Sequence, residues 1–295
     1  GLEQPGRWGG LVDLPAELDD RALTRLASVL NGIEDQVAIR PSGVFARRLV
    51  RAPFGVVRGR WLPRGTVLVT GGTGALGRRV GEWLLGLGAE EVVLASRSGG
   101  VVGGLPAGVR VVACDVADRA SVAALLDGLP GLTAVVHAAG VSRSTVLADL
   151  SAEELSEVMA AKAAGAAHLD ELLGERELDA FVLFSSVAGV WGSGAGGAYS
   201  AANAFLDGVA ERRRARGLRA TSIAWGPWGG GGMAEVEGDG LRRRGLRSLA
   251  PEVAIAALQR ALDEDLTCLT VADVDWSVFA PAFTAARPRP LISEL

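Results

Sequence analysis

The chain has one lysine, Lys162, and one tyrosine, Tyr199, among its 295 residues. The other 29 basic side chains are arginines, so arginine fills almost every generic cation position. A phenol gives and takes protons near neutral pH when a fixed cation lies beside it. The scarcity of both residue types makes Lys162 and Tyr199 candidates for one shared site.

Other absences exclude whole classes of protein. Cys114 and Cys268 are too few for a disulfide framework and lack metal-ligand spacing, so we expect reduced thiols and no metal. A net charge of −4 and short arginine runs at 212–214 and 242–244 provide no basic field for nucleic acid. No apolar run approaches the roughly 20 residues of a membrane span, and no signal peptide opens the chain. The sequence predicts a soluble, cytoplasmic protein without nucleic-acid or membrane partners.

From residue 63 onward, short β-rich runs alternate with helical patterns. The predicted strands cover 66–70, 91–95, 109–113, 134–137, 180–184, 220–224 and 268–272. The predicted helices cover 75–87, 118–127, 151–173, 198–216 and 251–263. A capping box, Ser151-x-x-Glu154, begins the long helix over 151–173. This alternation predicts an α/β fold, a Rossmann-type doubly wound parallel sheet with helices on both faces.

Residues 1–62 follow another pattern, with β-like patches at 9–14 and 36–40, a helix at 19–30 and a strand at 44–50. These elements are too few to form a core alone. We therefore expect a part of a structural subdomain over 1–62 and a catalytic part over 63–295, in a fragment of a larger polypeptide. The proline-rich segment 286–290 is predicted to begin a linker.

A glycine-rich turn follows the first strand of the catalytic part and leads into a helix. Glycines there allow a tight turn and close approach to a pyrophosphate at the helix N-terminus. The alternative is that these glycines only form a tight turn between strand and helix and bind no cofactor. The second strand ends in Ser96-Arg97, where a guanidinium can pair with a 2′-phosphate, and this favours NADPH over NADH. Asp115 can meet the adenine or cap the next helix. The predicted cofactor contacts are Gly72, Thr73, Gly74, Leu76, Gly77, Ser96, Arg97, Asp115, Val116, Ala138, Ala139, Gly140, Pro227 and Trp228.

A second group of residues carries the candidate chemistry. Ser186 ends a strand at the carboxyl edge, where open α/β sheets bind ligands. Tyr199 follows thirteen residues later, and Asn203 lies one helical turn further on the same face. Two hydroxyls can hold a carbonyl oxygen, and the tyrosine can protonate it as hydride reaches the carbon. Lys162 could lower the tyrosine pKa and pass protons from solvent. Alternatively, these residues are an interface aromatic, a surface cation and a strand-end cap.

Four motifs together resemble short-chain dehydrogenases/reductases. They are Thr70-Gly-Gly-Thr-Gly-Ala-Leu-Gly77, His137-Ala-Ala-Gly140, Phe184-Ser-Ser186 and Tyr199-Ser-Ala-Ala-Asn203. Most of that superfamily carries lysine four residues after the tyrosine, whereas here Asn203 and Lys162 are exchanged. The exchange is typical of ketoreductase domains of modular type I polyketide synthases and of related fatty-acid synthase domains, and the chain resembles the former more narrowly. Segments 8–14, 36–40 and 46–49 are similar to the end of that family's structural subdomain.

The resemblance implies a substrate and partners. The expected substrate is a β-ketoacyl chain on the phosphopantetheine arm of an acyl carrier protein, reduced by NADPH to the β-hydroxyacyl thioester. In this reading Tyr199 is the proton donor, Ser186 the oxyanion partner, Lys162 the tuning cation and Asn203 a relay residue. The other partners are domains of the same synthase, and we expect the isolated domain to be monomeric. The alternatives are a redox-inactive scaffold or epimerase and a stand-alone reductase of a free ketone.

Stereochemical markers of the family point to an A-type enzyme that gives the L-hydroxyl. Trp191 stands eight residues before the tyrosine, as in A-type members, and the B-type Leu-Asp-Asp run is absent from 141–145. A second marker stands three residues before the tyrosine and is usually glutamine in the A1 subtype and histidine in the A2 subtype. This chain has Gly196 there, and the lack of histidine weakly favours A1. Trp191 could instead be a packing residue. The glycines at 229–232 and Met233 resemble the start of a mobile lid or form a flexible surface loop.

Overall fold

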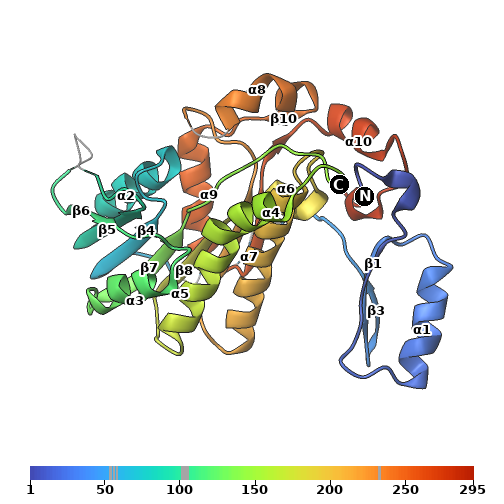
Figure 1. Cartoon of the computed structure of the whole chain (residues 1–295), viewed down its shortest axis with the longest axis horizontal. Helices are drawn as coiled ribbons and strands as arrows, with labels where there is room; N and C mark the ends of the chain where they lie inside the picture. The colour runs from blue at the N-terminus through green and yellow to red at the C-terminus, as the bar shows by residue number, and fades with distance from the viewer. Residues whose placement is uncertain (53–54, 56, 58, 101–105, 232–233) are drawn as a thin grey trace. The chain divides into compact units, whose positions relative to one another are not determined.

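Seven parallel strands form the main sheet of the protein (Figure 1). In spatial order they are β11 (Cys268–Val271), β9 (Thr221–Trp225), β8 (Ala180–Ser186), β7 (Leu132–His137), β4 (Thr66–Thr70), β5 (Glu91–Ser96) and β6 (Val109–Ala113). The strand order reverses between β4 and β7, and open α/β sheets bind ligands at the carboxyl ends of strands beside such a reversal. This computed structural model, which describes residues 1–52, 55, 57, 59–100, 106–231 and 234–295, confirms the predicted parallel sheet.

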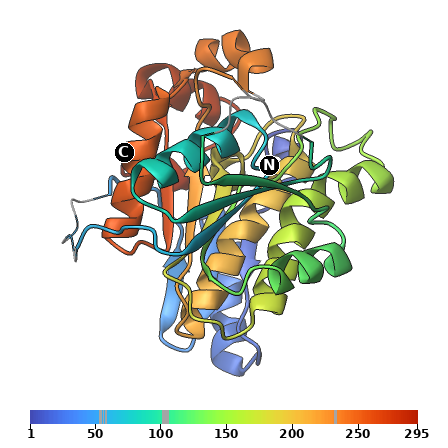
Figure 2. The ribbon, with the colours of Figure 1, turned by 90° about the vertical axis from the view of Figure 1, so that its left-hand side faces the viewer.

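Helices cover both faces of the sheet (Figure 2). The helices of this unit are α2 (Ala75–Gly86), α3 (Arg119–Asp127), α4 (Ala152–Met159), α5 (Gly165–Leu173), α6 (Val187–Trp191), α7 (Gly197–Ala215) and α9 (Pro251–Asp263), together with α8 (Ala234–Arg243), whose described residues pack on β10 (Leu246–Arg247) and not on the main sheet. Successive strand residues point to opposite faces, so Leu68 packs with α3, α5 and α7, whereas Val67 packs with α2 and α9. Burial on both faces explains why these strands are continuous apolar runs.

A buried ion pair joins the helices of one face. Arg213 on α7 is fully buried and donates to Oδ1 of Asp170 on α5 at 2.6 Å. Arg216 donates to the same oxygen at 2.6 Å. The Arg213 guanidinium also lies 4.2 Å from the ring centroid of Phe181 on β8. These contacts hold α5 against α7. The helix α7 carries two of the candidate catalytic residues, and α5 directly follows the turn that carries a third.

A smaller unit consists of Gly1–Phe54 and Asp275–Leu295. Its sheet contains β1 (Leu11–Asp13), β2 (Gln36–Arg40) and β3 (Gly43–Ala46), with β1 parallel and β3 antiparallel to β2. Its helices are α1 (Asp20–Leu30), which Asp19 caps, and α10 (Trp276–Thr284). Large apolar side chains of this unit are exposed, among them Leu11, Leu14, Leu18, Leu23, Leu30, Ile33, Val44, Phe45 and Val50.

Two sequence predictions need correction. Segment 286–290 does not begin a linker, because Leu49 N–H donates to Leu291 O at 2.7 Å and both Leu291 and Ile292 are buried. The strand predicted over 44–50 ends at Ala46. The helix predicted over 151–173 is confirmed from Ala152 to Leu173, and it contains a π-helical turn at Ala160–Ala164 between α4 and α5. In the described part of the chain, every helix is too short or too polar to cross a bilayer.

Candidate active site

The glycine turn between β4 and α2 brings three strand ends into close contact. A Cβ at Gly72 would lie 2.6 Å from Leu94 Cβ on β5, and one at Gly77 would lie 2.5 Å from Gly72 Cα. Gly71 has φ +67°, and a Cβ there would lie 2.7 Å from Ala139 N, after β7. Gly71 was not among the predicted cofactor contacts, although the strand end needs its left-handed backbone as much as it needs Gly72.

The N-terminus of α2 has no side-chain cap, as is also true of α7 and α9. Asp19, Asp118 and Ser151 cap α1, α3 and α4, whereas Gly74 offers no side chain to the first turn of α2. Thr73 and Leu76 lie on either side of this position. An uncapped helix N-terminus reached through glycines can accept an anionic group such as a pyrophosphate.

Four residues that were predicted to contact the adenosine half of the cofactor lie at the ends of β5 and β6. Ser96 Oγ is buried without a partner, and the adjacent Arg97 is exposed. Asp115 Oδ1 accepts from Ala117 N–H at 3.0 Å, and Val116 is buried. Asp118, not Asp115, caps α3. Asp115 therefore bends the chain ahead of the helix but does not act as its cap.

Lys162 lies in the middle of the π-helical turn and points into the protein. It is 4% exposed, and its ammonium donates to Phe184 O at the end of β8, at 2.8 Å. The same nitrogen lies 5.7 Å from the ring centroid of Tyr199. A Cβ at Gly140 would lie 2.7 Å from Lys162 Cε, so that glycine leaves room for the lysine stem. The structure brings the only lysine and the only tyrosine together.

Burial makes the charged form of Lys162 energetically unfavourable in this position. Burial lowers the pKa of Lys162 to about 8, and the negative charge of Asp207 on α7 opposes that shift. The ammonium remains largely protonated at neutral pH, and only part of its water shell is replaced by the Phe184 carbonyl.

Ser186 ends β8, and Asn203 lies on α7 one turn after Tyr199. Ser186 Oγ accepts from Ala188 N–H at 3.2 Å and thereby caps α6, which leaves its own hydrogen available for donation. The capping alternative is therefore correct, and it is compatible with a catalytic task. Asn203 is fully buried on α7; its Nδ2 donates to Tyr199 O at 2.7 Å, and its Oδ1 has no partner.

The stereocontrol candidates lie in the segment between α6 and α7. Trp191 ends α6 and is buried, and Gly196 directly precedes α7. A Cβ at Gly196 would lie 2.9 Å from Ser193 Cβ, so a side chain there would displace Ser193. Thr145 N–H donates to Ala195 O at 2.7 Å, which joins this segment to the loop after β7.

After β9 the chain enters the segment predicted to cover the nicotinamide. Pro227 O accepts from Leu249 N–H at 2.7 Å, and Trp228 is buried against Trp225, with ring centroids 5.0 Å apart. Gly230 and Gly231 both have positive φ. Met233, predicted to belong to the substrate groove, lies outside the described residues.

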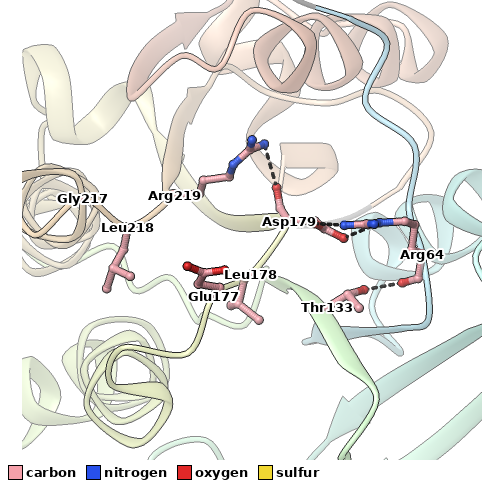
Figure 3. Close-up of a pocket in the computed structure, with 8 residues that line it drawn as sticks. All are labelled: Arg64, Thr133, Glu177, Leu178, Asp179, Gly217, Leu218 and Arg219. Carbon is pink, nitrogen blue, oxygen red and sulfur yellow. Dashed lines mark hydrogen bonds and ion pairs between the residues drawn. The ribbon is translucent and has the colours of Figure 1, made fainter.

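A hollow of about 470 Å³ lies at the opposite edge of the sheet, at the amino ends of β7, β8 and β9 (Figure 3). Two of its charged side chains, Arg64 and Asp179, are paired with each other. Arg64 makes two hydrogen bonds to the Asp179 carboxylate, at 3.0 and 2.5 Å, and Arg219 Nη1 lies 3.4 Å from Asp179 O. We assign no ligand to it. The described residues also contain no cluster of three or more potential metal-ligating side chains.

The residues at the carboxyl edge fit a nicotinamide dinucleotide. The crowded glycines leave only backbone facing the turn, α2 has no capping side chain, and Ser96 Oγ is buried without a partner. Residues 65–230 match the family described as KR domain. The chain belongs to this family. It is a ketoreductase domain of the modular type I polyketide synthase kind, within the short-chain dehydrogenase/reductase superfamily of nicotinamide-dependent oxidoreductases.

Comparisons with individual proteins agree with this assignment. Over its whole length the ketoreductase is 54% identical to polyketide synthase GfsA of Streptomyces halstedii and 53% identical to erythronolide synthase EryA3 of Saccharopolyspora erythraea. It spans only 4% and 10% of those proteins.

Solved structures of similar fold include two differently named types. A structure of A-type ketoreductases from a modular polyketide synthase has a TM-score of 0.94 at 48% identity, over 100% of this chain and 66% of that one. A C2-type ketoreductase from a modular polyketide synthase has a TM-score of 0.93 at 46% identity, over 100% of this chain and 67% of that one. The predicted family and fold are confirmed, whereas the type of ketoreductase stays a prediction.

Proposed function

We propose that this ketoreductase reduces a β-ketoacyl thioester, carried on the phosphopantetheine arm of an acyl carrier protein, to the β-hydroxyacyl thioester. One observation carries the proposal: the only lysine of the chain is buried at the end of β8 with its charge beside the ring of the only tyrosine. A structural cation would be solvated or paired with a carboxylate, whereas this one is bound to a backbone carbonyl with its charge over the tyrosine ring.

The proposed roles follow from the contacts of each side chain. Tyr199 gives its phenolic proton to the ketone oxygen, and Ser186 Oγ donates a hydrogen bond to the same oxygen. The positive charge of Lys162 stabilises the phenolate that remains. Asn203 holds the backbone of Tyr199 through its Nδ2, and its Oδ1 is available to a relay water.

For the cofactor we propose NADPH, which supplies the hydride when bound. Arg97 is exposed beside the partnerless Ser96 Oγ, and no acidic side chain ends β5. A guanidinium and a hydroxyl together suit a 2′-phosphate, whereas the ribose diol of NADH would need a carboxylate. We propose that the other residues predicted to contact the cofactor bind it as well.

The proposed stereochemical outcome is the L-hydroxyl of an A-type enzyme. The supporting observations are Trp191, buried at the end of α6, and the absence of a Leu-Asp-Asp run over 141–145. Ser193, which crowds the Gly196 position, is the natural place to look for an effect on the substrate's α-substituent. The partners we propose are the acyl carrier protein and the other domains of the same synthase.

The test uses the purified chain, NADPH and a racemic 2-methyl-3-ketoacyl thioester. We expect loss of absorbance at 340 nm and one product diastereomer, identified by chiral chromatography. Tyr199→Phe should reduce kcat by about 10²–10⁴-fold while NADPH still binds, because the variant lacks only the transferable proton. A Tyr199→Phe variant with near-normal turnover would refute the mechanism.

The same assay separates the alternative functions. A scaffold or epimerase would consume no NADPH, and an epimerase would exchange the α-proton of the thioester in D₂O. A stand-alone reductase would turn over free ketones much better than thioesters.

A further inference from the structure

His137 is a buried residue to which the proposed mechanism gives no task. It ends β7 at the carboxyl edge of the sheet and is fully buried. Both ring nitrogens are hydrogen bonded: Nδ1 lies 2.7 Å from Thr70 Oγ1 at the end of β4, and Nε2 lies 2.9 Å from Lys162 O. One imidazole thus joins two strand ends to the turn that carries the only lysine.

The direction of these two hydrogen bonds is fixed by chemistry. A backbone carbonyl can only accept, so Nε2 must carry the hydrogen that points to Lys162 O. Burial lowers the pKa of His137 to about 4, so the ring is neutral at working pH and Nδ1 accepts from Thr70 Oγ1–H. The threonine hydroxyl therefore selects the tautomer that can bond to the lysine backbone.

The turn that His137 contacts is not one that its sequence favours. Five residues, four of them alanine, form a π-helical turn, in which Gly165 N–H donates to the carbonyls of both Ala160 and Lys162. Such turns are rare and are found most often at functional sites. The packing is tight, since a Cβ at Gly165 would lie 3.0 Å from His137 Cε1. A specific contact from outside the helix must help to keep the turn wide.

We propose that His137 is a positioning residue that holds the backbone of Lys162 in the π-helical turn, so that the ammonium reaches Phe184 O and Tyr199. Its catalytic consequence rests on the proposed function, whereas its effect on Lys162 does not. The groups that face the ammonium are Tyr199 and Asp207 from α7 and the Phe184 carbonyl from β8. The neutral His137 from β7 contacts the backbone carbonyl of the lysine.

Two substitutions at His137 separate the effect of its hydrogen bond to Lys162 O from the effect of its side-chain volume. In His137→Gln the side-chain amide extends to the place of Nε2 and can still donate to Lys162 O. In His137→Asn the amide reaches only the place of Nδ1, so contact with Thr70 can remain and the donor to Lys162 O is lost. Both variants are polar, uncharged and smaller than histidine, which makes each a control for the other.

The only lysine of the chain gives a direct readout. With [¹³Cε]lysine, Lys162 contributes the single labelled side-chain resonance, and its pH titration reports the lysine pKa without substrate or cofactor. We expect a pKa near 8 in the wild type and in His137→Gln. In His137→Asn we expect a rise of about one pH unit or more, because a less tightly held lysine regains water. The kcat should fall at least tenfold in His137→Asn and less than threefold in His137→Gln, with NADPH affinity unchanged in both.

The outcomes distinguish this inference from the proposed function. An unchanged Lys162 titration in a folded His137→Asn variant would overturn the positioning role, and so would equal shifts in both variants. If no form of the protein reduces the thioester but only His137→Asn moves the lysine titration, the proposed function fails and the positioning role stands. Should His137→Asn not fold, Thr70→Val against Thr70→Ser repeats the comparison. Thr70→Val removes the donor that selects the tautomer, so the lysine titration should move in that variant alone.

Discussion

The cost of burying Lys162 predicts how its replacement changes stability with pH. The lysine pKa is about 8 in the folded protein, against an ordinary value of 10.5. The unfolded chain therefore binds this proton more tightly than the folded one, so the wild type gains stability as pH rises from about 8 to about 10.5. Lys162→Met fills a similar volume and removes this linkage. Between about pH 7 and about pH 9.5, the wild type should gain about 2 kcal/mol of unfolding free energy relative to Lys162→Met.

Urea unfolding of both proteins across this pH range measures the difference. With Tyr199→Phe in both proteins, the phenol beside the ammonium is removed, and the other titrating groups are common to the two chains, so their contributions cancel in the subtraction. The carbonyl of Phe184 loses its donor in the variant, and this adds an offset that does not vary with pH. If the two curves of unfolding free energy against pH run parallel, the lysine is not held in the desolvated position described above.

Two further predictions concern the glycine turn and the buried ion pair. Gly72→Ala should abolish NADPH binding in a fluorescence titration, because its Cβ would collide with Leu94, whereas Gly86→Ala, where the space is open, should leave binding intact. Asp170→Asn should lower the unfolding free energy by about 3–5 kcal/mol, since Arg213 keeps a buried charge without its carboxylate. Burial alone would raise the pKa of Asp170, but hydrogen bonds from Arg216 and Arg213 hold it below its usual value. Glu175→Gln, at an exposed pair, should change stability by less than about 1 kcal/mol.

Much of the fold could be predicted because its causes are local. The strands are apolar runs bounded by turn residues, and their alternation with helices leaves few topologies. The pairing of Tyr199 with Lys162 was suggested by rarity and motif spacing, and the structure brings the two together. The predicted roles of the cofactor and stereocontrol residues stay predictions.

The π-helical turn could not be predicted, because its cause is not local. Ala160-Ala-Lys-Ala-Ala164 is a strong α-helix sequence, and no residue within it signals a wide turn. The contact that supports it comes from His137, 25 positions earlier in the chain. The hydrogen bond from Leu49 N–H to Leu291 O was missed for the same reason. A proline-rich segment is equally compatible with a linker and with a tail that is hydrogen bonded to a distant part of the chain.

The division of the smaller unit between the two ends of the chain has a consequence for the order of folding. Segment 275–295 must be synthesised before that unit can be completed, and its contacts with residues 1–54 close a very long loop. Closing such a loop in an unfolded chain costs entropy and slows folding. Within the larger unit, Trp61 N–H donates to Asp263 Oδ1, 202 positions away, so prior folding of that unit shortens the loop. We therefore expect the sheet of seven strands to form first, and pulse-labelled hydrogen exchange should show amides of β1–β3 protected later than those of β4–β9.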